Sequence, residues 1–193
     1  MSLAFRSYVG ADAGAVLDRL ARLRIAVFRD WPYLYDGDLT YERRYLDLYT
    51  APRAIVVGAF DGDVMVGAAT GMPLTDHDQE FTTALAGSAP LDRIFYCAES
   101  VLLPDYRGQG AGHAFFDLRE THAGSLGLTR SAFCAVQRPT DHPARPADYQ
   151  PLDAFWRKRG YQPVEGAIAH FAWKDLGTAG ETEKPLQFWM KRL

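Results

Sequence analysis

Residues 106–113, with glycines at three alternating positions, have the composition of an anion-binding turn. The apolar segment before them, residues 94–103, is predicted to be a strand, and helical spacing of apolar residues begins at Ala111. A turn of this kind directs several backbone N–H groups into one small volume, and the dipole of the following helix adds partial positive charge. Glycines let the backbone approach an anion without clashes from Cβ atoms. The pattern therefore predicts binding of a phosphate or pyrophosphate.

Two familiar phosphate-binding motifs do not fit this turn. A P-loop needs Gly-Lys-Ser/Thr, which does not follow the glycines, and a dinucleotide fingerprint needs Gly-x-Gly-x-x-Gly in an early βαβ unit. The spacing Arg-x-x-Gly-x-Gly does fit, on Arg107, Gly110 and Gly112. Together with residues 101–106, this stretch resembles the acetyl-CoA-binding segment of the GCN5-related N-acetyltransferases, the GNAT superfamily. The alternative interpretation is a simple tight turn between strand and helix.

The resemblance implies acetyl-CoA as co-substrate and assigns residues to it. The amides of the turn would hold the pyrophosphate, Arg107 would add positive charge, and the preceding strand edge would pair with the pantetheine arm. An N–H group of the same stretch would polarise the thioester carbonyl, as in an oxyanion hole. The expected cofactor-binding residues are Val101, Leu102, Leu103, Arg107, Gly108, Gln109, Gly110, Ala111, Gly112 and Trp156.

Glu99 is the candidate general base. In the family that the chain resembles, an amine attacks the thioester directly, and an alkyl ammonium with a pKa of about 10 must first lose a proton. Glu99 interrupts an otherwise apolar strand two residues before the stretch expected to pair with pantetheine. A carboxylate there would bind the ammonium and accept its proton through water. The alternative is that Glu99 faces solvent or forms an ion pair.

The general acid is less clear from the sequence, because the chain departs from the family pattern. The tyrosine that usually protonates the departing CoA thiolate corresponds here to Trp156, and an indole N–H is no acid near neutral pH. His142 and Tyr149 precede that helix and are candidate replacements, since histidine titrates in the useful range. Protonation by solvent, or a site without catalysis, are the alternatives.

Two segments are expected to bind the acceptor. The aromatic loop with Trp31, Tyr33 and Tyr35 lies where this fold usually walls the acceptor site, although a packing corner between helices would have the same composition. Arg138 and Arg145 lie in a loop stiffened by prolines and could clamp a carboxylate or phosphate. The alternative for them is that of surface arginines in a rigid turn.

The elements expected around these residues give the order β-α-α-β-β-β-α-β-α-β-β, which is that of the GNAT fold. The fold class is α/β (α+β), a mixed twisted sheet flanked by helices, in one domain over residues 1–193. Asp12 is expected to cap the first helix. Strands are predicted at residues 4–9, 54–60, 64–72, 94–103, 131–136, 161–173 and 186–190, and helices at residues 12–27, 41–49, 111–126 and 151–160, with a polar loop at 177–185.

Composition narrows the class of protein. The 193 residues carry a formal net charge of −3, which argues against nucleic acid and anionic membranes as partners. No apolar run approaches the roughly 18 residues of a membrane span, and no secretory signal is evident. Cys97 and Cys134 are expected to be reduced, buried thiols of a cytoplasmic protein. The five histidines lack the spacing of a zinc site, so no metal is expected.

The sequence thus predicts an N-acetyltransferase that moves an acetyl group from acetyl-CoA to a small-molecule amine or a protein amine. A non-catalytic acyl-CoA-binding or sensing module is the alternative from another class, suggested by Trp156. A transferase using a longer acyl-CoA is a third reading. Neither the acceptor nor the formation of a homodimer is decided by the sequence.

Overall fold

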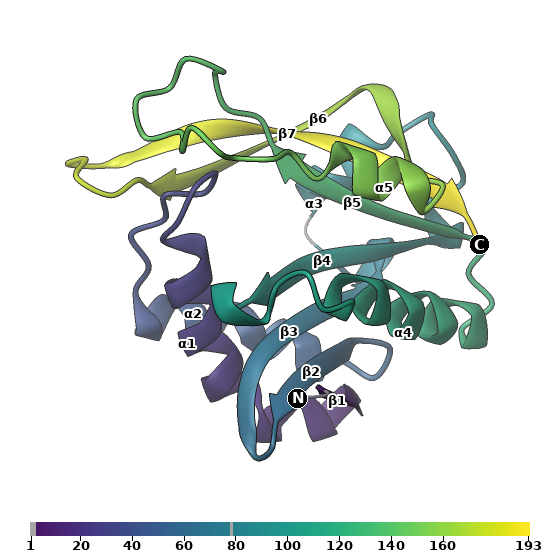
Figure 1. Cartoon of the computed structure of the whole chain (residues 1–193). Helices are drawn as coiled ribbons and strands as arrows, with labels where there is room; N and C mark the ends of the chain where they lie inside the picture. Colours follow the sequence, from purple (N-terminus) through teal and green to yellow (C-terminus); the bar gives the residue numbers. More distant parts are fainter. Residues whose placement is uncertain (1–2, 78) are drawn as a thin grey trace.

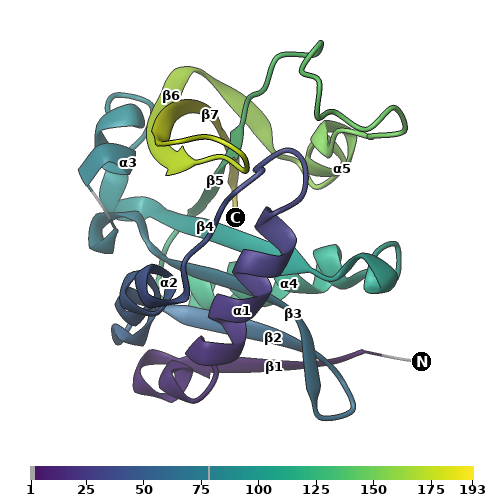
Figure 2. The same ribbon diagram turned by 90° about the vertical axis from the view of Figure 1, so that its left-hand side faces the viewer.

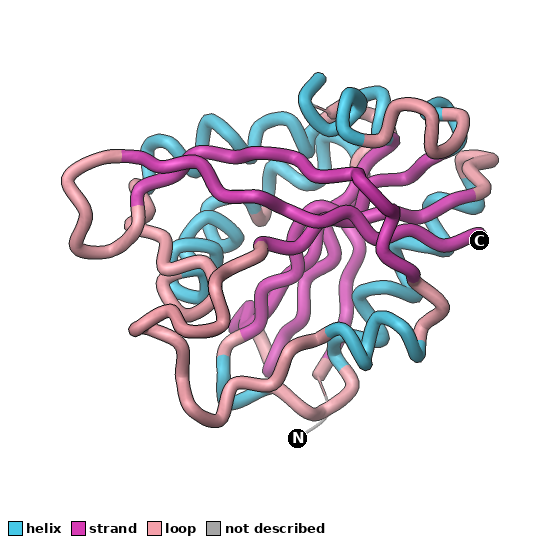
Figure 3. The backbone as a smooth tube through the Cα atoms, turned by 90° about the horizontal axis from the view of Figure 1, so that it is seen from above, coloured by secondary structure: helices cyan, strands magenta, loops and turns pink. Residues whose placement is uncertain are grey.

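One seven-stranded mixed sheet organises the chain (Figure 1) in the computed structural model, which describes residues 3–77 and 79–193. The strands lie in the order β1-β2-β3-β4-β5-β7-β6, and only β4 and β5 are parallel. Figure 3 shows how strongly the sheet twists, since β6 and β7 cross the direction of the other strands. The strands are β1 (Ala4–Val9), β2 (Ile55–Asp61), β3 (Val64–Pro73), β4 (Ile94–Leu102), β5 (Arg130–Val136), β6 (Gln162–Lys174) and β7 (Glu181–Arg192).

Helices cover both faces of the sheet. Helices α1 (Leu17–Phe28) and α2 (Leu39–Leu46) lie on one face and α4 (Ala111–Ser125) on the other (Figure 2). Two helices are shorter. Helix α3 (Gln79–Ala84) packs against β6, and helix α5 (Asp153–Lys158) packs beside α4. The predicted α/β fold with a mixed sheet between helices is confirmed.

Two elements differ from the sequence prediction. Residues 10–15 form a 3-10 helix, so Asp12 lies inside it and caps nothing, whereas the Asp38 side chain accepts the Tyr41 N–H at 2.9 Å and caps α2. The polar stretch from Glu181 belongs to β7, because its backbone pairs with β6 from Glu181 opposite Lys174 onward. The polar side chains of this stretch predict a loop, but hydrogen bonds between its main chain and that of β6 make it a strand.

Each face of the sheet has its own core. Leu20 and Leu46, from α1 and α2, pack with Val56 and Met72 of the sheet. Phe115 of α4 packs on the opposite face, with Ile55, Phe95 and Phe133 among its neighbours in that cluster. Each core fixes the helices on its own face, so the sheet between them becomes a rigid support for the residues at the centre of β4.

Candidate functional site

Strands β4 and β5 separate near the middle of the sheet. They pair at three positions only, from Ile94 opposite Arg130 to Tyr96 opposite Ala132. Beyond Tyr96 they diverge, and Figure 1 shows the divergence opening toward the start of α4. The later residues of β4 are therefore paired with β3 on one side and have no strand partner on the other.

A β-bulge lies where the two strands separate. The pairing of β3 with β4 shifts between Ala69 opposite Ser100 and Gly71 opposite Cys97, so that two residues of β4 oppose Thr70 alone. The extra residue changes which face the following side chains occupy. Before the bulge Cys97 faces α4, whereas after it Val101 packs in the core of α1 and α2.

Glu99 lies in this bulge, and its carboxylate faces α1 and α2. It forms an ion pair with Arg24 and accepts hydrogen bonds from the hydroxyls of Thr70 and of Tyr45, the latter at 2.9 Å. Arg24 also pairs with Glu42 of α2, which is fully buried. Of the two expectations for Glu99, the ion pair is the one that the structure shows.

These contacts change the chemistry expected of Glu99. Burial opposes ionisation of the carboxyl, but the Arg24 guanidinium and the Thr70 and Tyr45 hydroxyls outweigh it, and they hold its pKa below the ordinary value. A carboxylate with a lowered pKa is a weak base. The ion pair thus makes Glu99 a weaker base than a free carboxylate, and its role as general base stays a prediction.

The turn before α4 has the geometry of an anion site. Gly108 and Gly110 have φ of 74° and 85°, in the left-handed region that favours glycine. Within the part of the chain that the structure describes, no hydrogen bond is donated by the backbone N–H groups of residues 108–112. The free amides lie at the start of a 15-residue helix, whose dipole favours a negative group.

Gly112 is needed for close packing of two helices and not for an unusual backbone conformation. A Cβ atom on it would lie 3.3 Å from the Phe155 ring, so α5 approaches α4 closely at this point. Glycine at 112 thus fixes the distance of α5 from the turn, which the sequence motif alone does not reveal.

Arg107 has a different partner from the one expected. Its Nε donates to the Leu102 carbonyl at 3.2 Å, and the side chain is exposed. Leu103 N–H donates to Val66 of β3, so the neighbouring Leu102 points its polar backbone groups to the side where β5 has departed. Arg107 therefore occupies a main-chain acceptor of the strand edge predicted to pair with pantetheine.

Trp156 of α5 packs at a tilt against two aromatic rings of the sheet, Phe133 of β5 and Trp189 of β7. Its ring centroid lies 4.9 Å from that of Phe133 and 5.2 Å from that of Trp189. Tyr161, fully buried, donates from its hydroxyl to Glu120 at 2.8 Å and lies 2.6 Å from the Ser131 hydroxyl. Burial raises the pKa of Tyr161, which belongs to the core on the α4 face of the sheet.

Arg138 does not point at an acceptor, contrary to one of the two expectations for it. Its guanidinium binds both carboxylate oxygens of Asp175 at 2.8 and 2.9 Å and donates to the carbonyls of Pro32 and Tyr33. The side chain is 8% exposed. Four of the five guanidinium N–H groups are thereby engaged within the protein, and Arg138 ties the loop after α1 to the β6–β7 hairpin, which lie side by side in Figure 2.

The aromatic loop after α1 is divided between two surroundings. Tyr33 is packed between Phe28 and Trp173, and Tyr35 forms a β-bridge with Asp175. Trp31 instead meets the proline-rich loop, and its ring lies 5.1 Å from His142 and 6.0 Å from Tyr149. Of the three, Trp31 makes ring contacts with both candidate acids, whereas burial and, to a smaller extent, neighbouring groups that include Tyr149 raise the pKa of Tyr33.

His142, Tyr149 and Arg145 belong to this same cluster. The Arg145 guanidinium lies 5.2 Å from the centre of the Tyr149 ring, and the Ala144 N–H donates to His142 Nδ1 at 3.2 Å. Burial raises the pKa of Tyr149. The Trp31 indole N–H is buried and has no hydrogen-bond partner among the described residues, so this cluster retains an unused donor.

Arg119 is a residue of the site that sequence reasoning missed. It is 1% exposed on α4 and donates to the carbonyls of Thr70 and Glu99, both at 3.0 Å, and to the Ser100 hydroxyl at 2.9 Å. The sequence did hold one sign of it: Arg119 lies seven residues after Gly112, on the same helix face as the apolar Phe115 and Phe116, where a charged residue is unexpected.

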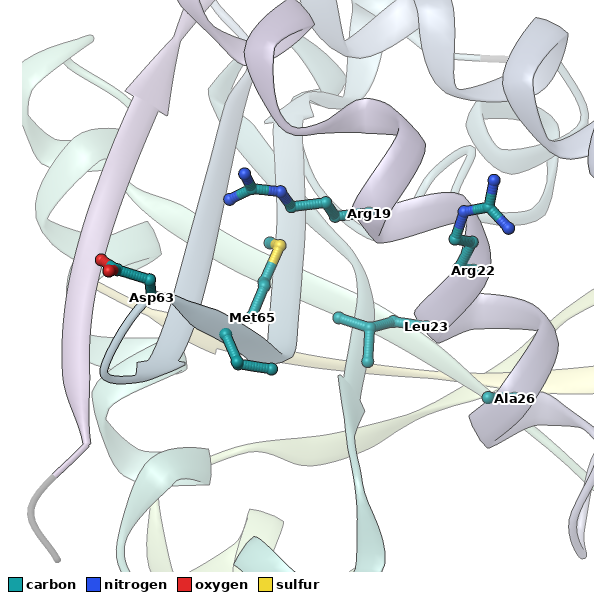
Figure 4. A pocket seen from close by; sticks show the side chains of 7 residues that line it. Arg19, Arg22, Leu23, Ala26, Asp63 and Met65 are labelled. Atoms are coloured by element: carbon teal, nitrogen blue, oxygen red, sulfur yellow. The ribbon is translucent and has the colours of Figure 1, made fainter.

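Other features of the surface and interior lie apart from the predicted residues. Figure 4 shows a shallow hollow between α1 and the β2–β3 turn, lined by residues such as Arg19, Leu23 and Met65. Cys97 and Cys134 are free and buried. No three His, Cys, Asp or Glu side chains of residues 3–77 and 79–193 gather as a metal site, and no helix there has the length and apolar character of a membrane span.

The sequence and the fold both resemble those of known proteins. Residues 20–161 match the sequence profile of the acetyltransferase (GNAT) family. The fold is similar to that of a ribosomal-protein-alanine N-acetyltransferase from Brucella melitensis, with TM-score 0.64 and 14% identity over 98% of this chain and 99% of that one. No curated protein matches the sequence.

Two further structures of similar fold hold a cofactor. An aminoglycoside 6'-N-acetyltransferase complexed with coenzyme A has TM-score 0.61 and 17% identity over 100% of this chain and 97% of that chain. A structure from Salmonella typhimurium with its cofactor acetyl-CoA has TM-score 0.59 and 12% identity over 100% and 95%. At these identities the likeness concerns the fold.

Proposed function

The chain belongs to the GNAT family of acetyltransferases, and we propose that it transfers an acetyl group from acetyl-CoA to an amine. The observation that carries the proposal is the set of free amides at residues 108–112, at the end of β4 where β5 has already diverged from it (Figure 1). A pyrophosphate on those amides and a pantetheine arm along Leu102 would bring a thioester to the bulge at Glu99. The family match does not favour the non-catalytic alternative.

The residues fit acetyl-CoA in both charge and shape. Gln109 and Ala111, with the glycines around them, would hold the pyrophosphate through main-chain N–H groups, as helix starts commonly do. Arg107 would exchange the Leu102 carbonyl for a phosphate when the cofactor binds, which would free that carbonyl for a pantetheine amide. Trp156 would flank the arm from α5.

In the reaction the amine nitrogen bonds to the thioester carbonyl carbon, and the carbon–sulfur bond then breaks. The products are an N-acetyl compound and CoA, and the proton lost by the amine balances the one gained by the departing thiolate. The backbone N–H of Ser100 would stabilise the oxyanion that forms between the two events.

Proton transfer is assigned to water and not to Glu99. The pKa of Glu99 is held low by its partners, so an ammonium would deliver its proton to solvent while the carboxylate attracts the cation. The one guanidinium of Arg24 and the two carboxylates of Glu42 and Glu99 together give this cluster a net charge of −1, which favours a cationic acceptor. His142 and Tyr149 remain candidates for the proton donor to the thiolate.

The acceptor is proposed to be a small-molecule or protein amine that enters beside Trp31. The unused indole N–H and the neighbouring Arg145 would contact its polar groups. Turnover is tested by measuring release of the CoA thiol from acetyl-CoA with a panel of polyamines, amino sugars and peptides. Release that depends on one class of amine is expected, whereas binding of acetyl-CoA without release on any amine would refute catalysis.

A further inference from the structure

Arg119 is a buried cation without an acidic partner among the described residues. Its four hydrogen bonds go to three backbone carbonyls and one hydroxyl, and the Phe116 ring centre lies 4.9 Å from its guanidinium carbon. No carboxylate of residues 3–77 and 79–193 lies within ion-pair distance of it. Burying an unpaired charge costs free energy, so we expect the hydrogen bonds of Arg119 to stabilise a feature that an apolar residue at this position would leave unsupported.

That purpose is visible in which carbonyls it binds. The bulge takes Thr70 and Glu99 out of the regular ladder between β3 and β4, and a single Arg119 nitrogen, Nη1, donates to both carbonyls. The second nitrogen, Nη2, reaches the Ser100 hydroxyl. Arg119 thus replaces the ladder hydrogen bonds that a bulge loses, and it does so from α4, the helix that begins at the glycine turn.

The contact with Glu99 also orients the next N–H group. A trans peptide holds its C=O and N–H in opposite directions, so fixing the Glu99 carbonyl fixes the Ser100 N–H. Leu103 N–H points to Val66 of β3, and alternate residues of an antiparallel strand point to opposite sides, so Ser100 N–H points to the side that β5 has left.

We infer that Arg119 is the positioning residue that aims the Ser100 N–H at the thioester carbonyl of the bound donor. This rests on the proposed function, because it needs acetyl-CoA beside β4. Arg119 touches neither donor nor acceptor. It acts through the Glu99–Ser100 peptide, and it links the orientation of that peptide to the helix whose N-terminus binds the pyrophosphate.

The test uses acetyl-CoA labelled with ¹³C at the thioester carbonyl. In the wild type the bound carbonyl resonance is expected downfield of free acetyl-CoA, because a hydrogen bond polarises the C=O. Arg119→Lys keeps the charge but cannot reach both carbonyls and the hydroxyl. It should return the resonance toward the free position and lower kcat by about 100-fold, with affinity for acetyl-CoA changed less than about threefold.

Ser100→Ala removes only the contact with Nη2 and should move the resonance part of the way. Arg22→Lys, on the exposed face of α1, serves as the control and should leave both readouts unchanged. A bound carbonyl that resonates as in the wild type in folded Arg119→Lys would overturn the inference. If that variant does not fold, an unchanged resonance in Ser100→Ala overturns it instead.

Calorimetry separates this failure from that of the proposed function. Wild-type protein that binds no acetyl-CoA contradicts the proposed function, and the inference falls with it. Wild-type protein that binds acetyl-CoA with its carbonyl resonance at the free position contradicts the inference alone.

Discussion

Replacing Arg24 with methionine tests the electrostatic account of the site. Among residues 3–77 and 79–193, Arg24 is the one side chain in ion pairs with Glu42 and Glu99, whose side chains are 0% and 8% exposed. Methionine fills much of the same volume but leaves two buried carboxylates without their counter-charge. Breaking a buried ion pair in this way costs about 3–5 kcal/mol, so we expect the free energy of unfolding at pH 7.5 to fall by that amount.

The pH dependence of the loss gives a sharper test. In the wild type the folded pKa of Glu99 lies below its ordinary 4.5, so its contribution to stability is present above pH 4.5 and is lost as pH falls through the folded value. Without Arg24, burial dominates and raises that pKa. The destabilisation of Arg24→Met should therefore be largest near neutral pH and should shrink as pH falls toward 5.

The assay is urea denaturation followed by circular dichroism at pH 7.5, 6 and 5. Arg22→Met is the matched control, since it removes an exposed ion pair with Asp18 from the same helix and should cost about 0.5 kcal/mol or less. A loss for Arg24→Met that equals that of the control, or one that does not change with pH, would refute the reasoning.

Two further predictions concern residues whose roles the structure revises. Arg138→Met should lower the free energy of unfolding by about 2–4 kcal/mol, because Asp175 loses a bidentate partner, while leaving the acetyl-CoA Kd unchanged by calorimetry; an unaltered stability would contradict the tie between loop and hairpin. Glu99→Gln should reduce kcat/KM for the amine with little change in acetyl-CoA affinity, and full activity would show that the carboxylate has no part in the reaction.

Much of the fold was predictable because local signals and their order agree. The strand predicted at residues 4–9 and the glycine turn before α4 depend on residues adjacent in sequence, and the structure has both a strand and a helix there. A strand was predicted at residues 186–190, but the earlier part of β7, from Glu181, was missed because its polar side chains resemble a loop and only pairing with β6 defines it.

The contacts of the site were less predictable, because they join distant residues. Arg24 and Glu99 are 75 residues apart, and nothing local in either segment indicates their ion pair. The bulge depends on the register of β3 against β4, and a sequence pattern read strand by strand does not determine that register. The sequence therefore left open whether Glu99 would form an ion pair, and these two facts explain why its partner could not be named.

The central claim is that the amides of the turn before α4 bind the pyrophosphate of acetyl-CoA. Gly110→Asp places a carboxylate at the turn, and Gly127→Asp is its matched control, since both glycines have φ above 70° and a Cβ atom on either meets nothing within 4 Å. Strain is thus similar in the two variants, and only the first puts negative charge at the anion site.

Calorimetric titration of acetyl-CoA into wild type and both variants is the most direct measurement. We expect binding to the wild type and to Gly127→Asp, and a Kd at least about 100-fold higher for Gly110→Asp because of repulsion between like charges. Absence of binding to the wild type, or equal affinity of the two variants, would contradict the claim.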